Sequence, residues 1–124
     1  MPSRSFKKCK RLLNASDFRE VFEHNRLKVA NHSLLILAKP TDRPLSRLGL
    51  VIAKKNVPTA VQRNLIKRVV REAFRQHQFE IPMDIVFLAR SGANKLAARQ
   101  LTVQFRRSWL TLAERSKTVD TRHA

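Results

Sequence analysis

The segment Val61–Arg75, with the sequence VQRNLIKRVVREAFR, constrains the fold of this chain more than any other stretch. At a helical pitch of about 100° per residue, its side chains divide between two faces. A polar face of roughly 140°, called the basic arc below, carries Arg63, Asn64, Lys67, Arg68, Arg71 and Arg75. The opposite face carries Leu65, Ile66, Val69, Val70 and Ala73, and Phe74 lies at the edge of the arc. The pattern predicts a helix with one face in a core and a row of cations on the other.

The basic arc suits a polyanionic partner. Its only acidic neighbour, Glu72, lies off the arc, whereas a helix stabilised by surface salt bridges would interleave opposite charges at i,i+4 spacing. The chain has 26 Lys and Arg against 9 Asp and Glu, a formal net charge of +17, and the stretch from Arg43 to Arg71 has eight basic residues and no acid. Because the charge is concentrated, we favour nucleic acid over an anionic membrane or a surface that is basic only for solubility.

The composition of the arc favours RNA over DNA. A helix that reads duplex DNA mixes Asn, Gln and Ser with Arg to contact base edges, whereas this one is nearly all cation. Such a row suits contacts with the backbone and shape of RNA. Phe18 and Phe22 are candidates for stacking on unpaired bases, although each, taken singly, fits the core of an amphipathic helix better.

The rest of the chain predicts one α+β domain over residues 1–124, a small sheet packed on helices. Apolar runs predict strands at Ser33–Lys39, Arg47–Lys55 and Met83–Ala89, with the first two paired as a hairpin. Arg26–Ala30 is also strand-like.

Helix signals complete the order of elements. A short helix is expected over Asp17–His24, with Asn14 as its N-cap, and Thr59 is expected to cap the helix of the basic arc. A last helix carries apolar residues at spacings of three and four, namely Ala98, Leu101, Phe105, Trp109 and Leu112. Residues 1–12 are expected to be an extended basic lead-in and residues 114–124 a flexible tail.

No pattern in the sequence assembles a catalytic or metal site. The acids are isolated, without the paired carboxylates of metal-dependent nucleases, and two glycines cannot form a phosphate-binding glycine-rich loop. Cys9 is the only cysteine and the histidines are scattered, which excludes an internal disulfide and a thiolate zinc cluster. No apolar run approaches the roughly 18 residues of a membrane span, and the basic N-terminus lacks the apolar region of a secretory signal. We therefore expect a cytoplasmic nucleic-acid-binding module.

The run from Arg63 to Phe74 resembles the signature of the bacterial ribonuclease P protein family. That signature is RN, two residues, KR, two residues, RE or RQ, and an aromatic after one further residue; here it is RNLIKRVVREAF. The flanks agree, with Arg11-Leu12 before the first helix and Leu48-Gly49-Leu50 leading to Ala53-Lys54-Lys55. The resemblance covers roughly residues 8–112.

The resemblance implies an α-β-β-β-α-β-α sandwich of the ribosomal protein S5 domain 2-like kind, with a left-handed βαβ crossover. It implies a protein subunit that assists a catalytic RNA in the endonucleolytic removal of the 5′ leader from precursor tRNA. The RNA would carry the catalysis and bind most of the Mg²⁺ of the holoenzyme, so this chain would supply no catalytic residue and bind no metal tightly. The protein would neutralise charge and raise the affinity for substrate and Mg²⁺.

By the same resemblance, the catalytic RNA and the leader would face the basic arc together with Lys54, Lys55 and Arg11. Phe18 and Phe22 would line a central groove for the single-stranded leader. Some members place an aromatic on the facing strand, where Leu34–Leu37 offers only aliphatic side chains. Leader recognition here would then depend more on charge and on the first helix.

Two other interpretations stay open at this point. A generic, ribosomal-protein-like RNA-binding protein would have the same composition, but it gives no reason for the spacing of the signature. A stand-alone nuclease would need folding to bring Asp17, Glu20 or Asp84 together.

Overall fold

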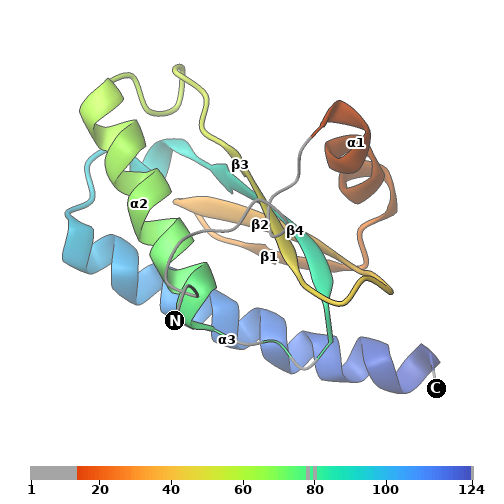
Figure 1. Cartoon of the computed structure of the whole chain (residues 1–124). Coiled ribbons are helices and arrows are strands. Elements are labelled where there is room, and N and C mark those ends of the chain that lie inside the picture. The colour runs from red at the N-terminus through yellow and green to blue at the C-terminus, as the bar shows by residue number, and fades with distance from the viewer. Residues whose placement is uncertain (1–13, 78, 80, 124) are drawn as a thin grey trace, which may run out of the picture.

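The computed structural model describes residues 14–77, 79 and 81–123, and its centre is a four-stranded sheet (Figure 1). The elements are α1 (Ala15–His24), β1 (Leu27–Ala30), β2 (Leu34–Pro40), β3 (Arg47–Val51), α2 (Ala60–Gln76), β4 (Met83–Ala89), the 3₁₀ turn η3 (Ser91–Ala93) and α3 (Ala98–His123). This order confirms the predicted α+β class. The predicted lead-in, residues 1–12 with Arg11, lies outside the described residues.

The strands lie in the order β1-β2-β4-β3. The predicted hairpin between Ser33–Lys39 and Arg47–Lys55, which correspond to β2 and β3, is therefore wrong. All of β2 pairs antiparallel with β4, and β3 pairs parallel with the other side of β4. The reason is burial, because β2 and β4 are apolar on both of their faces and take the two interior positions of the sheet. The chain runs from β3 through α2 to β4, a βαβ unit of neighbouring parallel strands.

The alternating side chains of the interior strands supply two cores on opposite faces of the sheet. Ile36 of β2 and Phe87 of β4 belong to the larger core, which α2 and α3 cover. Leu37 and Val86 belong to a smaller cluster, which Val21 of α1 covers. Both faces therefore need apolar residues, which explains the continuous apolar runs of these strands.

Helix α3 confirms the predicted apolar spacing and extends beyond it. Leu101, Phe105, Trp109 and Leu112 are buried, whereas Ala98, its first residue, is exposed. The flexible tail predicted from Glu114 differs from the structure, in which α3 continues to His123. Contacts with the sheet stabilise this extension, since Arg115 donates a hydrogen bond to the carbonyl oxygen of Lys28 in β1 and Ser116 is buried. The polar composition of the segment gave no indication of these contacts.

Candidate RNA interface

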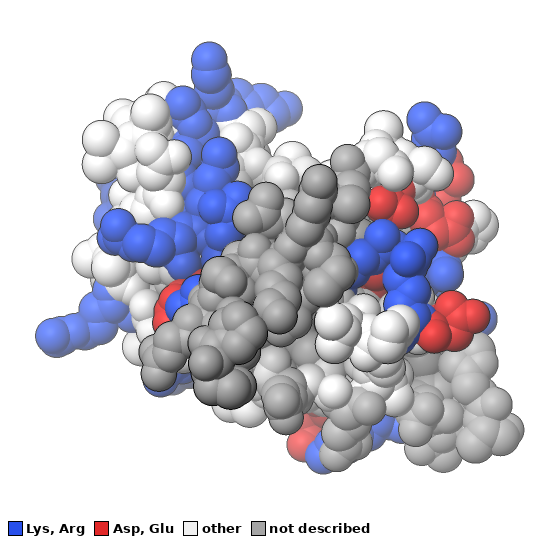
Figure 2. Space-filling model, viewed as in Figure 1, with Lys and Arg blue, Asp and Glu red and all other residues white. Residues whose placement is uncertain are grey.

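The helix α2 presents the basic arc because its other side is buried. As predicted, Thr59 caps the helix, its Oγ1 accepting a hydrogen bond from the N–H of Gln62 at 3.3 Å. The buried side consists of Ile66, Val69, Val70, Ala73 and Phe74. On the arc, the exposed residues are Asn64, Arg68 and Arg71, and the half-buried ones are Arg63, Lys67 and Arg75. Figure 2 shows Lys and Arg side chains gathered over α2.

Arg63 holds the loop that precedes α2. Its Nη1 donates hydrogen bonds to the carbonyl oxygens of Val57, at 3.0 Å, and Pro58, at 2.8 Å. From the other side, Asn56 Nδ2 donates to the carbonyl oxygen of Ala89 at 3.1 Å. These bonds fix the loop whose exposed Lys54 and Lys55 were predicted RNA contacts. Arg63 therefore positions those lysines, a role that the helical pattern does not reveal.

Arg75 at the end of the arc already has an acidic partner. Its guanidinium forms an ion pair with Glu72, one turn earlier on α2. Glu72 also accepts a hydrogen bond from Gln76 Nε2 at 2.8 Å. Since this pair neutralises part of its charge, Arg75 is a weaker candidate for a phosphate contact than Lys67.

The two phenylalanines of α1 have different environments. Phe18 is half-buried and packs on the smaller cluster, beside Leu35 and Leu37 of β2. The side chain of Phe22 is 43% exposed. Phe22 is thus the one with a face accessible to a nucleobase, whereas Phe18 fixes α1 to the sheet. Leu35 and Leu37 of β2 on this face are aliphatic, as the sequence indicated.

A buried charge cluster that the sequence did not reveal joins α1 to this face. Arg47 of β3 donates from Nε and Nη2 to the two carboxylate oxygens of Asp84 in β4, at 2.9 and 2.8 Å. The same guanidinium reaches Asp17 of α1 at 3.4 Å. The hydrogen bond to Asp84 raises the pKa of Arg47 above its ordinary value, against the effect of burial. The only signal in the sequence was a charged residue at the start of each of two apolar strands.

The Arg47 cluster also bears on the nuclease interpretation. Folding does bring Asp17 and Asp84 together, but both carboxylates are bonded to one guanidinium. A two-metal nuclease site needs carboxylates that are open to the metal ions. Among the described residues, no group of three His, Cys, Asp or Glu side chains could hold a metal ion.

No described helix is long and apolar enough to cross a membrane.

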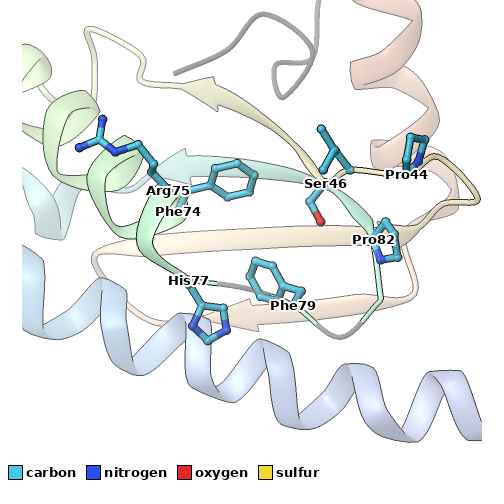
Figure 3. Close-up of a pocket in the computed structure, with 8 residues that line it drawn as sticks. Pro44, Ser46, Phe74, Arg75, His77, Phe79 and Pro82 are labelled. Carbon is cyan, nitrogen blue, oxygen red and sulfur yellow. The ribbon is translucent and has the colours of Figure 1, made fainter. Parts of the chain in front are cut away.

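A cavity of about 230 Å³ lies beyond the C-terminal end of α2 (Figure 3). Phe74 and Phe79 face it from one side and Ser46 and Pro82 from the other, and the guanidinium of Arg75 points away from it. Phe74 is 5% exposed although it lies at the edge of the basic arc, because its ring meets Trp109 of α3 edge-on at 6.3 Å. The arc therefore ends at an aromatic cluster of Phe74, Phe79 and Trp109.

Comparisons with known proteins agree on one family. A family model described as Ribonuclease P matches residues 6–113. The ribonuclease P protein component of Stutzerimonas stutzeri is 45% identical over 112 residues, which cover 90% of this chain and 86% of the relative. That of Saccharophagus degradans is 41% identical over 114 residues, which cover 91% of this chain and 84% of the relative.

Solved structures of ribonuclease P proteins have the same fold. The protein from Staphylococcus aureus aligns with a TM-score of 0.73 at 28% identity, over 89% of this chain and 97% of the other. The protein from Thermotoga maritima aligns with a TM-score of 0.68 at 28% identity, over 85% of this chain and 96% of the other.

Proposed function

The chain belongs to the ribonuclease P protein family, whose members are the protein subunit of an endoribonuclease that acts in tRNA 5′ processing. We propose how this chain contributes to that processing. Its α2 face binds the catalytic RNA, and its α1 side receives the single-stranded 5′ leader of precursor tRNA. The bound protein reduces the repulsion between the two RNAs and so tightens substrate binding.

The observation that supports the α2 contact most directly is the position of the basic arc opposite the buried side of α2. Lys67 and Arg71 share one side of the helix with the exposed Asn64 and Arg68. The loop with Lys54 and Lys55 lies just before the N-terminus of α2, where backbone N–H groups favour an anion. The arrangement suits a run of phosphates rather than one small anion.

The leader proposal is supported by the α1 side of the sheet. Phe22 offers an exposed ring, and stacking on one unpaired base contributes about 1–3 kcal/mol. The Arg47 cluster and an ion pair between Lys39 and Glu20, at 3.6 Å, fix α1 to the sheet, so this ring is held in place. Stacking with little base selectivity suits a substrate class whose leaders differ in sequence.

We propose that the Mg²⁺ of the holoenzyme is bound by the RNA. The described carboxylates do not fit a Mg²⁺ site, because those that converge are bonded to Arg47. The cations of the protein raise Mg²⁺ occupancy indirectly, by lowering the concentration of ions that the RNA needs for neutralisation. DNA is not a proposed partner, because the basic arc is nearly all cation, with Asn64 as its only amide side chain to read a base edge. A cytoplasmic setting is proposed from the single cysteine of the sequence.

The test is cleavage of precursor tRNA at low Mg²⁺ by the cognate RNA alone, the protein alone, and both together. We expect cleavage at the mature 5′ end only with both. Lys67→Ala should weaken binding of the catalytic RNA about three- to tenfold, as expected for one charge-assisted contact. Lys117→Ala, which removes the same charge near the far end of α3, should change it little.

Two results would contradict this proposal. Cleavage by the protein alone would mean that the chain has an active site. Intact RNA binding without any effect on cleavage would favour a generic RNA-binding protein instead.

A further inference from the structure

A groove between α2 and α3 lies beside the basic arc and shares only Arg68 with it. One part, of about 240 Å³, is lined by Arg68 and Glu72 of α2 and by Thr102 and Arg106 of α3. The next part shares Arg106 and adds His77, Trp109 and Leu110. Because the two parts share lining residues, we treat them as one surface, the α2–α3 groove.

The first part of the groove has unbalanced positive charge. Arg68 and Arg106 are both exposed and come from different helices, yet they line the same space. Within the described part of the chain, neither guanidinium group has a hydrogen bond or an ion pair. The one acid in the groove, Glu72, already accepts hydrogen bonds from Arg75 and Gln76. Two exposed arginines that line one space, whose single carboxylate is already bonded to Arg75 and Gln76, favour an anion, and phosphate matches the forked geometry of a guanidinium group.

The second part of the groove has polar atoms without partners. Trp109 is 1% exposed, and its Nε1–H has no hydrogen-bond partner in the described structure. The Nε2 atom of His77 is buried and equally unpartnered. A buried donor without an acceptor costs about 1–3 kcal/mol, but both nitrogens are too enclosed for a group in the groove to reach, so neither contributes to binding there. Leu110, 60% exposed, adds an apolar surface at the same place.

We propose that the α2–α3 groove is a second RNA-contact surface, in which Arg68 and Arg106 bind a phosphate of the catalytic RNA. The inference rests on the proposed function and extends its interface from one face of α2 across to α3. Phosphate satisfies the two guanidinium groups, which line the same space from different helices. Arg68 is the link, because it belongs both to the edge of the basic arc and to the groove.

Two neighbouring arginines allow a matched test. Arg106 lines the groove, whereas Arg107 is equally exposed but lines a different cavity, with Val29 and His32. Arg106→Ala and Arg107→Ala therefore remove the same charge from the same turn of α3 on different sides. The affinity of the full-length protein for the catalytic RNA would be measured for both variants over a range of salt concentrations.

We expect Arg106→Ala to weaken binding about tenfold, as expected for a charge-assisted hydrogen bond, and to reduce the magnitude of the salt slope by about 0.7–0.9. Arg107→Ala should stay within about twofold of the unmodified protein. Because Arg68 and Arg106 hold the same phosphate, Arg68→Ala combined with Arg106→Ala should lose less than the product of the single losses. Circular dichroism would verify that the variants are folded.

The outcomes separate this inference from the proposed function. Equal losses for Arg106→Ala and Arg107→Ala, with a clear loss for Lys67→Ala, would overturn the groove and leave the proposed function standing. No loss for any of the three would contradict the RNA surface on α2 itself. If Arg106→Ala changed only self-association in sedimentation, the groove would be a contact between copies of this chain.

Discussion

At the scale of single residues, the charge of Arg47 is buried between two carboxylates, and its main partner is Asp84. Asp84→Asn should lower the free energy of unfolding by about 3 kcal/mol, because a buried charge then loses its ionised partner. The raised pKa of Arg47 means that its stabilisation is complete below the ordinary arginine pKa and is lost only as the pH rises above it. Arg47 therefore stays charged at every ordinary pH, and a change of pH does not recover the stability that Asp84→Asn removes. Urea denaturation of Asp84→Asn and of Asp42→Asn, a control with the same charge change at an exposed position, measures the loss of stability. Equal losses for the two variants would contradict the prediction.

His77 predicts a response to acid. Burial lowers its pKa below the ordinary 6.5, so the unfolded chain binds the proton more readily than the folded one. The stability that the neutral ring contributes is complete above that pH and decreases as the pH falls toward the folded-state pKa. Urea midpoints at about pH 7.5 and about pH 5.5 should differ more for the unmodified protein than for His77→Gln. His24→Gln, at an exposed position, is the control, and equal pH responses for His77→Gln and the unmodified protein would refute the prediction.

Some side-chain roles were predictable from helical spacing and others were not. The exposure of Asn64, Arg68 and Arg71 follows from the angle of each residue around α2. The bonds of Arg63 to Val57 and Pro58 depend on the path of a loop, which periodicity does not encode. The Arg47 cluster depends on the register between β3 and β4, which is set by residues distant in the sequence.

At the scale of elements, the turn η3 is packed against the connection between β1 and β2. Gly92 donates its N–H to the carbonyl oxygen of His32 at 3.1 Å, and a Cβ on Gly92 would lie 2.3 Å from that oxygen. Gly92→Ala should therefore push the two segments apart and cost about 1–3 kcal/mol of stability. Thermal unfolding of Gly92→Ala and of Ser91→Ala, a control at an exposed neighbouring position, measures this cost. Similar Tm values for the two variants would contradict the close approach.

The type of each element was predictable from local pattern, whereas the order of the strands was not. The bounds of β4 are those that its apolar run indicated. The short segment between β2 and β3 suggested a hairpin, but pairing follows which strands can be buried on both faces. β3 is the shorter strand and its last two residues are only half-buried, so it takes an edge, whereas β4, which is buried along nearly its whole length, takes the interior position. The order of the strands depends on how all four of them compete for the interior positions of the sheet, so local sequence patterns do not determine it.

At the scale of the whole molecule, a net charge of +17 predicts a strong dependence of RNA binding on salt. Each phosphate that the protein neutralises on a single strand contributes about −0.7 to the slope of log K against log salt, so about six contacts give a slope near −4. Titration of the catalytic RNA at several chloride concentrations measures that slope. A flat response would exclude binding by charge neutralisation and would favour contacts with bases.

The central position of β4 also has a consequence for how the protein is made. The strand that joins β2 to β3 is the last of the four to leave the ribosome, so both of its neighbours have an open edge until it is synthesised. Folding during translation can complete α1 and the β1–β2 pair, but the sheet closes only near the end of synthesis. For the same reason, a chain cut between β3 and β4 would be divided through the middle of its sheet, and neither piece would contain a complete core.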